Sequence, residues 1–248
     1  MKNLSAFLFI IFMISFNIKD TKSMQANAQS PESVTIKKTS DFEINGEGTA
    51  TEWNQTEWIE LTQRSNLDSV DGWSSKLKIL YSDTGLYFLF HNDDEILNAT
   101  FDSHFEELWR EDVVEVFLWP DESQPVYFEY ELSPLNYELP LLVTNTDGEL
   151  SHWIPFDNSY RDDRKTRHKT SVQGGPKESG AEISAWRAEF FIPFELLRPL
   201  KNIFPESGTE WRANFYRIDY DHGPTHWTWQ PYERNFHDYE NFGTIKFE

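Results

Sequence analysis

Short stretches in which apolar and polar side chains alternate run through the chain beyond residue 40. Val113–Trp119 places Val114 and Val116 on one face, and Val126–Ser133 alternates in the same way. Successive side chains of a β-strand point to opposite faces, so each stretch indicates a strand that buries one face in a core. Apart from a short segment at Phe194–Leu200, no stretch keeps a helical period of 3.6 residues, which argues against a helical fold.

Turn residues separate these stretches and divide the chain into many short strands. Lys76–Ser82 and Leu86–Asn92 flank a turn that contains Gly85 and predict a β-hairpin. Later strands are expected at Arg167–Gln173, Ile183–Ile192, Trp211–Asp219, His226–Gln230 and Thr244–Phe247. Many short strands at regular spacing predict an all-β fold, an antiparallel β-sandwich with jelly-roll-like or immunoglobulin-like layers and one short helix.

The N-terminal segment has the layout of a secretory signal peptide. Lys2 precedes an apolar run from Leu4 to Phe16, and Ala26-Asn27-Ala28 provides a cleavage site of small residues. An uncleaved membrane anchor is the rival interpretation, although the run is shorter than the ~20 apolar residues of a membrane span. We expect a signal peptide at residues 1–28, a linker at 29–40 and a secreted domain, periplasmic or extracellular, at 41–248, with no membrane insertion after cleavage.

The charge of the chain limits its partners. With 42 Asp and Glu against 22 Lys and Arg, the formal net charge is −20 at pH 7. Such a surface repels nucleic acid, whose binding needs Lys and Arg to neutralise phosphates, and it disfavours an anionic membrane. The absence of cysteine excludes disulfides, thiolate metal sites and a cysteine nucleophile. A neutral ligand or a cation fits this chain better.

A tryptophan and a carboxylate lie close together around the strand at Val113–Trp119. Trp109 comes just before this strand, and Glu115 occupies the face opposite Val114 and Val116. Aromatic rings stack on the C–H face of a pyranose and carboxylates accept hydrogen bonds from its hydroxyls, so this pair suits a sugar. The segment alone leaves a second interpretation open, a buried tryptophan beside a solvated glutamate.

The C-terminal stretch is rich in aromatic and amide side chains. Asn235, Phe236 and His237 follow a strand that carries Trp227 and Trp229 on one face. Loop aromatics beside Asn and His are typical of a polar ligand site, whereas the tryptophan pair is also compatible with a core position.

Arg217 lies on the same strand face as Ala213 and Phe215, which is apolar. A charge on such a face needs a partner, because an unpaired buried charge is costly. The partner is either a buried acid or a ligand, and the sequence leaves both open.

An acidic turn follows the strand at Leu86–Asn92. Asp93 and Asp94, with Asp102 further along, supply the carboxylate oxygens that Ca²⁺ prefers. In a chain this acidic, a solvated turn without an ion is the alternative interpretation.

Several motifs occur in the order found in family 9 carbohydrate-binding modules, and the chain resembles these modules over roughly residues 41–248. The resemblance rests on Ile44-Asn45-Gly46, Trp53, the Leu77–Phe90 hairpin, Trp109 before Asp112-Val113-Val114-Glu115, Trp186, Glu189, Ile192-Pro193, Asn214, Arg217 and Phe242-Gly243. It implies an antiparallel β-sandwich that holds a sugar, often a reducing end, between two aromatic rings. It also implies structural calcium and association with a glycosidase.

The resemblance suggests roles for individual residues. Trp109 corresponds to one ring of the aromatic clamp, and Phe236 and His237 stand near the position of the other ring. Glu115 matches a polar contact of the family. Glu129 departs from the pattern, because the family has an arginine there.

These observations predict a secreted, non-enzymatic module that binds an oligosaccharide or polysaccharide and supports carbohydrate catabolism. Trp109 and Phe236 are expected to stack on the sugar. Its hydroxyls are expected to bond Glu115, Asn235, Arg217 and His237. The expected protein partner is a separate glycoside hydrolase.

Three other functions remain as alternatives. Hydrolysis of O-glycosyl compounds needs two carboxylates ~5–9.5 Å apart, for which Glu115, Glu129 and Glu131 are candidates. A haem carrier needs Met or His ligands, and all three methionines lie in the predicted signal peptide. A protein-interaction sandwich without sugar binding is the third.

Overall fold

The computed structural model describes residues 32–64, 72–147, 149–156 and 160–248, so the predicted signal peptide at residues 1–28 lies outside the described residues. The strands are β1 (Ser33–Lys38), β2 (Ile59–Arg64), β3 (Ser75–Tyr81), β4 (Gly85–Asp93), β5 (Val113–Trp119), β6 (Val126–Leu132), β7 (Glu138–Thr146), β8 (Glu149–Pro155), β9 (Arg167–Gln173), β10 (Ala185–Pro193), β11 (Glu210–Asp219), β12 (Thr225–Thr228) and β13 (Gly243–Phe247). Short 3₁₀ helices are η1 (Thr51–Gln55), η2 (Leu108–Arg110), η4 (Asp162–Arg164), η5 (Phe194–Leu197) and η6 (Tyr239–Asn241). Within the described residues, none of the helices has the length and apolarity needed to cross a membrane.

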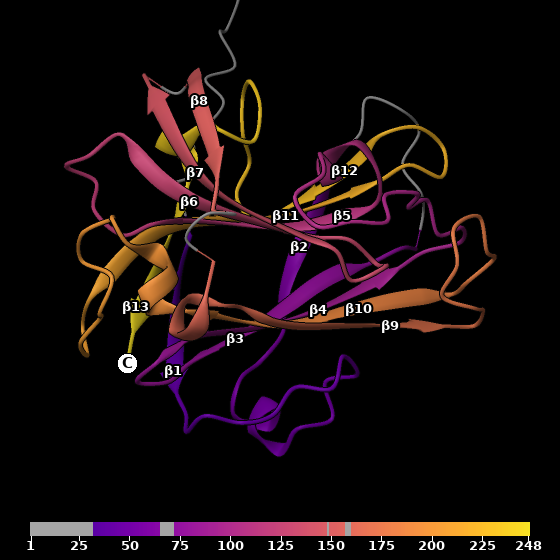
Figure 1. Cartoon of the computed structure of the whole chain (residues 1–248), viewed down its shortest axis with the longest axis horizontal. Helices are drawn as coiled ribbons and strands as arrows, with labels where there is room; N and C mark the ends of the chain where they lie inside the picture. Colours follow the sequence, from indigo (N-terminus) through magenta and orange to yellow (C-terminus); the bar gives the residue numbers. More distant parts are fainter. Residues whose placement is uncertain (1–31, 65–71, 148, 157–159) are drawn as a thin grey trace, which may run out of the picture. The chain divides into compact units, whose positions relative to one another are not determined.

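The strands form two layers (Figure 1). The first layer has the order β8-β7-β6-β5-β11-β12-β2, and the second has the order β2-β3-β4-β10-β9. β2 belongs to both layers, because Thr62–Arg64 pairs with β12 and Ile59–Leu61 pairs with β3. β1 crosses in the same way from β13, which lies beside β11, to β3. Strands that switch sheets close one edge of a sandwich, and the predicted all-β sandwich is confirmed.

β1 corrects the prediction of a linker at residues 29–40. Ser33–Lys38 is a strand that pairs in parallel with β13 and β3, and its Ile36 side chain is buried in the core. Only Val34 and Ile36 alternate with polar residues here, and two apolar positions are too few to predict a strand from the sequence. The folded domain therefore begins before residue 41.

The other predicted strands are present with ends shifted by one or two residues, and β2, β7 and β8 are additional. β7 is buried on both faces, and β8 is an edge strand with mostly exposed side chains, so neither shows a clear alternation. The predicted helix at Phe194–Leu200 is a shorter 3₁₀ turn, η5. It ends at Leu197 because Arg198 precedes Pro199, and the residue before a proline disfavours helical backbone.

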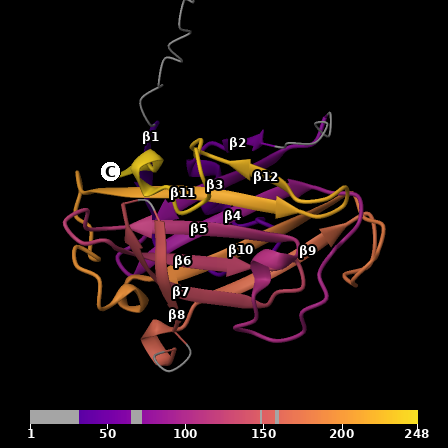
Figure 2. The ribbon, with the colours of Figure 1, turned by 90° about the horizontal axis from the view of Figure 1, so that it is seen from above.

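Large side chains fill the space between the two layers. Val114 and Val116 of β5 face this core as predicted. Phe88 of β4 and Phe190 of β10 face it from the other layer, with ring centroids 5.1 Å apart. The first layer is apolar on its outer face as well, where Phe117, Tyr127, Leu141, Tyr216 and Phe242 form a second cluster. Figure 2 looks onto this outer face, with β5, β6 and β7 side by side.

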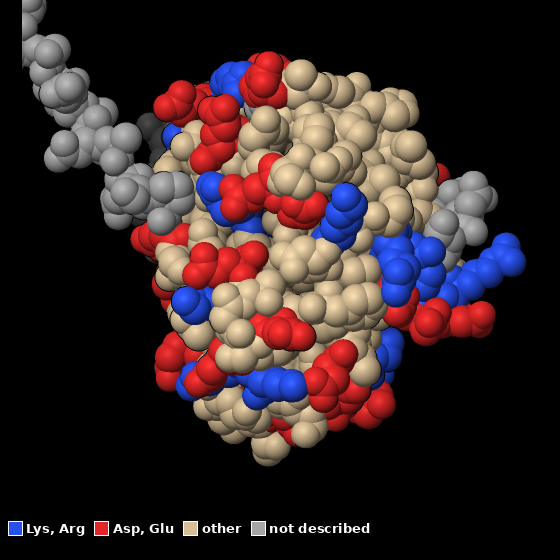
Figure 3. Space-filling model, turned by 90° about the vertical axis from the view of Figure 1, so that its left-hand side faces the viewer, with Lys and Arg blue, Asp and Glu red and all other residues tan. Residues whose placement is uncertain are grey.

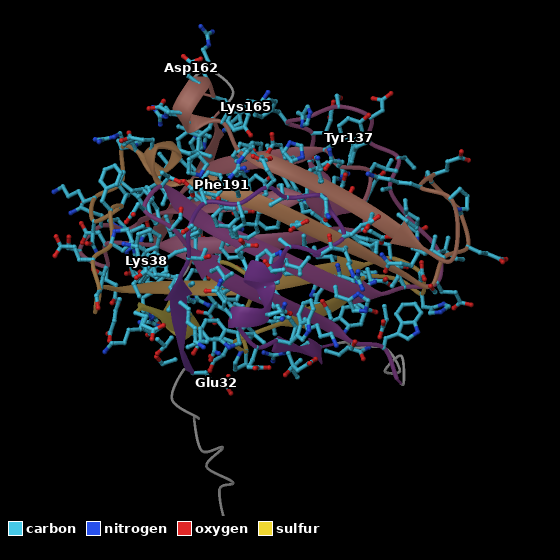
Figure 4. All side chains as sticks on the ribbon, turned by 90° about the horizontal axis from the view of Figure 1, so that it is seen from below. Glu32, Lys38, Tyr137, Asp162, Lys165 and Phe191 are labelled. Atoms are coloured by element: carbon cyan, nitrogen blue, oxygen red, sulfur yellow. The ribbon has the colours of Figure 1, made fainter. Side chains whose placement is uncertain are left out.

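The segment between β1 and β2 covers the outer face of the second layer, which Figure 4 shows from below with Phe191 labelled. Trp53 of η1 packs edge-on against Phe42 at 5.4 Å. The buried carboxylate of Glu189 accepts hydrogen bonds from the Gly46 backbone N–H at 2.7 Å and from the Trp53 indole at 2.8 Å. These motif residues therefore hold the segment onto the sheet and lie on the opposite layer from the site described below.

Charged side chains of both signs are interspersed over the face of the domain in Figure 3. Many of the exposed ones are paired, as Lys38 is with Asp83 at 2.6 Å and Arg198 with Glu195 at 2.6 Å. Such exposed pairs contribute at most about 1 kcal/mol each, so the stability of this fold comes from its buried interactions.

Candidate functional site

A cavity of about 1140 Å³ opens on the outer face of the first layer. Its floor consists of Glu115 and Phe117 of β5, Glu129 of β6, Leu141 of β7 and Ile218 of β11. Its walls include Trp109 of η2, Leu150 and Trp153 of β8, Gln63 and Arg64 of β2, and the segment 232–237 after β12. Strand alternation places a carboxylate in this otherwise apolar floor, because Val114 and Val116 face the core and Glu115 therefore faces outward.

Five of the six side chains predicted to contact a ligand line this one cavity: Trp109, Glu115, Asn235, Phe236 and His237. They come from two segments that are distant in sequence, residues 109–115 and 235–237. β11 joins these segments, because it pairs with β5 and its Tyr216 hydroxyl donates to the Phe236 carbonyl at 2.8 Å. Their contact with a ligand stays a prediction.

Two tryptophans form one wall of the cavity. The rings of Trp109 and Trp153 meet edge to face, with centroids 5.6 Å apart and an angle of 76° between their planes. Both side chains are half-buried, and the Tyr220 hydroxyl holds the Trp109 carbonyl at 2.9 Å. The sequence analysis missed Trp153 because β8 has no clear alternation, so nothing in the local pattern placed this ring beside Trp109.

Phe236 has one ring face already covered. It stacks on Tyr216 with centroids 4.0 Å apart and an interplanar angle of 8°, and His226 meets it edge-on at 4.9 Å. Phe236 lines the cavity with the part of its ring that these neighbours leave free. It is therefore a fixed apolar surface rather than a freely movable ring.

Two buried carboxylates lie at the floor of the cavity. Burial raises the pKa of Glu129 to about 8, and burial together with the neighbouring Glu129 raises the pKa of Glu115 well above its ordinary value. Within the described residues, neither carboxylate pairs with a Lys or Arg, and Oε2 of Glu129 has no hydrogen-bond partner. An unpartnered buried acceptor is costly, so Glu129 presents a polar atom that a ligand could satisfy.

His237 does not neutralise these carboxylates. Its Nδ1 is 3.9 Å from Oε2 of Glu129, but burial lowers its pKa to about 4, so the imidazole is neutral at pH 7. The ring is held by the Tyr127 hydroxyl at 2.6 Å from Nδ1. The side chain of Asn235 accepts the His237 backbone N–H at 2.8 Å and so shapes this turn.

β2 supplies hydrogen-bond donors that the sequence analysis missed. Nε2 of Gln63 and Nη1 of Arg64 are buried and have no partner within the described residues, although both side chains line the cavity. The Arg64 guanidinium lies 4.8 Å above the ring of Tyr232. Because β2 was not predicted, no sequence signal pointed to these donors.

Arg217 corrects the expectation that it contacts a ligand. It is fully buried between the layers, where its guanidinium pairs with Asp94 at 2.9 Å and Asp219 at 2.6 Å and lies 4.5 Å from the ring of Trp227. The sequence left open whether Arg217 pairs with a buried acid or with a ligand, and the structure shows that it pairs with buried acids. The reason is strand alternation: Arg217 shares the core face with Phe215, whereas Tyr216 and Ile218 face outward.

The three predicted calcium ligands do not converge. Asp93 accepts hydrogen bonds from Ser74 and Asp102 is exposed, so neither joins Asp94. Asp94 instead approaches Asp219 and Asp221 closely enough to share an ion. Its Oδ1 is buried and has no partner in the part of the chain that the structure describes, but Arg217 already supplies a positive charge to this cluster.

We predict that the stability of the protein falls as the pH rises from about 4.5 to about 8. The folded state binds the Glu129 proton more tightly than the unfolded chain, because burial raises this pKa from 4.5 to about 8. Glu129→Gln carries no titrating proton at this position and should not show this fall. From pH 5 to pH 8, its free energy of unfolding should therefore rise by about 1 kcal/mol or more relative to that of the unmodified protein. Urea unfolding at both pH values measures the difference. The exposed Glu178→Gln serves as control, and equal pH slopes in all three proteins would contradict the prediction.

Comparison with protein families and with curated proteins identifies relatives of this chain. A family model described as "Carbohydrate family 9 binding domain-like" matches residues 44–173, just over half of the chain. A curated relative, an "Extracellular protein" of Arthroderma benhamiae, is 26% identical over 113 residues. That match covers 45% of this chain and 47% of the relative, so the chain spans about half of the relative's length.

Solved structures share the fold at low sequence identity. A candidate carbohydrate-binding protein from Bacteroides uniformis superposes with a TM-score of 0.68 and 18% identity, over 88% of this chain and 100% of that one. A family 9 carbohydrate-binding module from Caldicellulosiruptor kristjanssonii in complex with cellotriose has a TM-score of 0.60 and 18% identity, over 88% and 94%. The same module in complex with glucose has a TM-score of 0.59 and 18% identity, over 88% and 96%.

Proposed function

Because the chain belongs to the carbohydrate family 9 binding domain-like family, we propose that it binds a glycan in the cavity on the outer face of β5, β6, β7 and β11. The observation that carries this proposal is the combination of a tryptophan wall with two buried carboxylates in the floor. Trp109 and Trp153 offer apolar ring surface. Glu115 of β5 and Glu129 of β6, which are adjacent strands, offer carboxylate oxygens in the same cavity. A pyranose has the same division into apolar C–H faces and polar edges.

The proposed contacts follow from the chemistry of each side chain. The ring of Trp109 stacks on one face of the sugar, and Phe236 adds a second apolar surface in the same cavity. Glu115 and Glu129 exchange hydrogen bonds with hydroxyls, and burial keeps a proton on Glu129 that it can donate. Gln63 and Arg64 supply donors that have no partner within the described residues.

Calorimetric titration of the chain without residues 1–28 tests this function. The panel contains gluco-, xylo- and manno-oligosaccharides together with their reduced alditols. We expect saturable binding to at least one oligosaccharide and, if the reducing end is the contact, loss of binding to its alditol. Silence across the panel, with the protein folded and calcium present, would reject glycan binding and favour a protein-interaction role on the same fold.

Hydrolysis of the glycan is the second candidate, favoured by the two carboxylates in the cavity. A glycosidase separates its carboxylates into a protonated acid and an ionised base or nucleophile. Burial raises the pKa of both Glu115 and Glu129, so both favour the protonated form. The pair therefore does not show the one protonated and one ionised carboxylate that hydrolysis needs. Release of reducing sugar during the titration, abolished by Glu129→Gln, would establish hydrolysis.

We also propose that the protein acts outside the cytoplasm in carbohydrate catabolism, alongside a separate glycoside hydrolase. The signal-peptide pattern of residues 1–28 and the "Extracellular protein" description of the Arthroderma benhamiae relative support the location. Structural calcium remains part of the proposal, with Asp94, Asp219 and Asp221 as the residues that would hold it.

A further inference from the structure

A cluster of two histidines and a glutamate lies at an edge of the sandwich, and none of its side chains lines the cavity. His104 comes from the segment between β4 and β5, Glu138 begins β7, and His168 lies in β9. One ligand atom of each side chain lies within 4.8 Å of the other two. We propose that these three side chains bind a divalent transition-metal ion of the Zn²⁺ class.

The two imidazoles bring ring nitrogens close to one carboxylate oxygen. Nε2 of His168 lies 3.1 Å from Oε1 of Glu138, and its Nδ1 lies 3.1 Å from Oδ1 of Asn136. Nδ1 of His104 lies 4.0 Å from the same Glu138 oxygen and accepts the Glu138 backbone N–H at 3.2 Å. An ion bound here would replace these hydrogen bonds with coordination by the two imidazoles and the carboxylate.

The carboxylate is held in place by hydroxyl donors. The Thr166 hydroxyl donates to Oε2 of Glu138. The hydroxyls of Tyr130 and Tyr160 donate to its two oxygens at 2.6 and 2.5 Å. Such outer hydrogen bonds orient the ligands of a metal, and they are already present here.

The donor set indicates which ion fits. Two imidazole nitrogens and one carboxylate oxygen are typical of zinc sites with an open position, whereas Ca²⁺ and Mg²⁺ prefer oxygen ligands. The side chain of His104 is 44% exposed, which gives an ion a path into the cluster.

The position of the cluster gives the ion a structural effect. Glu138 belongs to the first layer and His168 to the second, at the edge opposite the one that β1 and β2 close. In Figure 4, Tyr137 and Lys165, which precede Glu138 and Thr166, lie along the same side of the sandwich. A bound ion would therefore join the two layers, and through His104 it would restrain the segment that carries Trp109.

The experiment is calorimetric titration of tag-free, EDTA-treated protein with ZnCl₂ at pH 7.5, with MgCl₂ as a comparison. We expect one equivalent of Zn²⁺ to bind, and His104→Ala to bind it at least tenfold more weakly. His152→Ala is the matched control, because it removes an exposed imidazole of β8 outside the cluster. Hydrogen exchange of residues 101–111 is expected to slow with Zn²⁺ in the unmodified protein and not in His104→Ala.

The proposal is overturned by three results. They are the absence of saturable Zn²⁺ uptake, equal affinity in the unmodified protein and His104→Ala, and equal weakening by His104→Ala and His152→Ala. The first two would leave the contact between Glu138 and His168 as a structural interaction without a metal. His168→Gln provides a second ligand variant, to be compared only if its circular dichroism spectrum matches that of the unmodified protein.

Discussion

Replacing Trp109 with alanine is expected to weaken glycan binding by about 1–3 kcal/mol, or roughly 5- to 150-fold, while the protein stays folded. Trp109 is half-buried, lines the cavity and contacts Trp153 edge to face at 5.6 Å. Its removal takes away the ring surface on which the sugar is proposed to stack, and it leaves the core between the layers untouched because Trp109 packs on the outer cluster. Titration with the best oligosaccharide of the panel measures the loss.

Trp58→Ala is the matched control for this experiment. Trp58 is also half-buried, but it packs at the outer face of the second layer, where Lys76 and Lys78 approach its ring at 5.3 and 5.2 Å. We expect it to leave the affinity unchanged. If Trp109→Ala instead lowers the melting temperature sharply with unchanged affinity, the ring is a packing element and the site assignment is wrong.

Replacing Arg217 with methionine is expected to lower the free energy of unfolding by about 3–5 kcal/mol. The guanidinium is fully buried and pairs with Asp94 and Asp219, and it donates to the Asp93 carbonyl at 2.5 Å. Methionine keeps much of the volume but leaves two buried carboxylates without their cation. Denaturant unfolding at pH 7 measures the loss.

The pH dependence of this variant supplies a second readout. Burial already raises the pKa of Asp94 to about 7 and also raises that of Asp219, against the opposing effect of Arg217. Without the guanidinium both pKa values rise further, so the folded state of Arg217→Met should lose additional stability as the pH increases through neutrality.

Arg198→Met is the control, because Arg198 forms an exposed ion pair with Glu195 at 2.6 Å. Its loss should change the free energy of unfolding little, because water screens an exposed ion pair. A similarly small loss for Arg217→Met would show that the buried ion cluster contributes little to stability.

The sequence predicted the fold class and much of the candidate site for one reason, strand alternation. Once Val114 and Val116 are assigned to the core, Glu115 has to face outward, and the same rule places Glu129 on the outer face of β6. The aromatic and amide composition of the stretch at 235–237 marked it as a ligand segment without any knowledge of its position. The structure brings these residues to one cavity.

The remaining features depend on contacts between residues far apart in the chain. Arg217 lies on an apolar strand face in any sandwich, but only the packing of β11 against the segment after β4 supplies Asp94 as its partner. Trp153 and Gln63 come from strands that the sequence did not predict, and His104, Glu138 and His168 come from three segments far apart in the chain. The alternation of apolar and polar side chains is a local property of the sequence, and it determined which face each strand buries. Which side chains meet across layers is set by long-range pairing, and only the tertiary structure decided it.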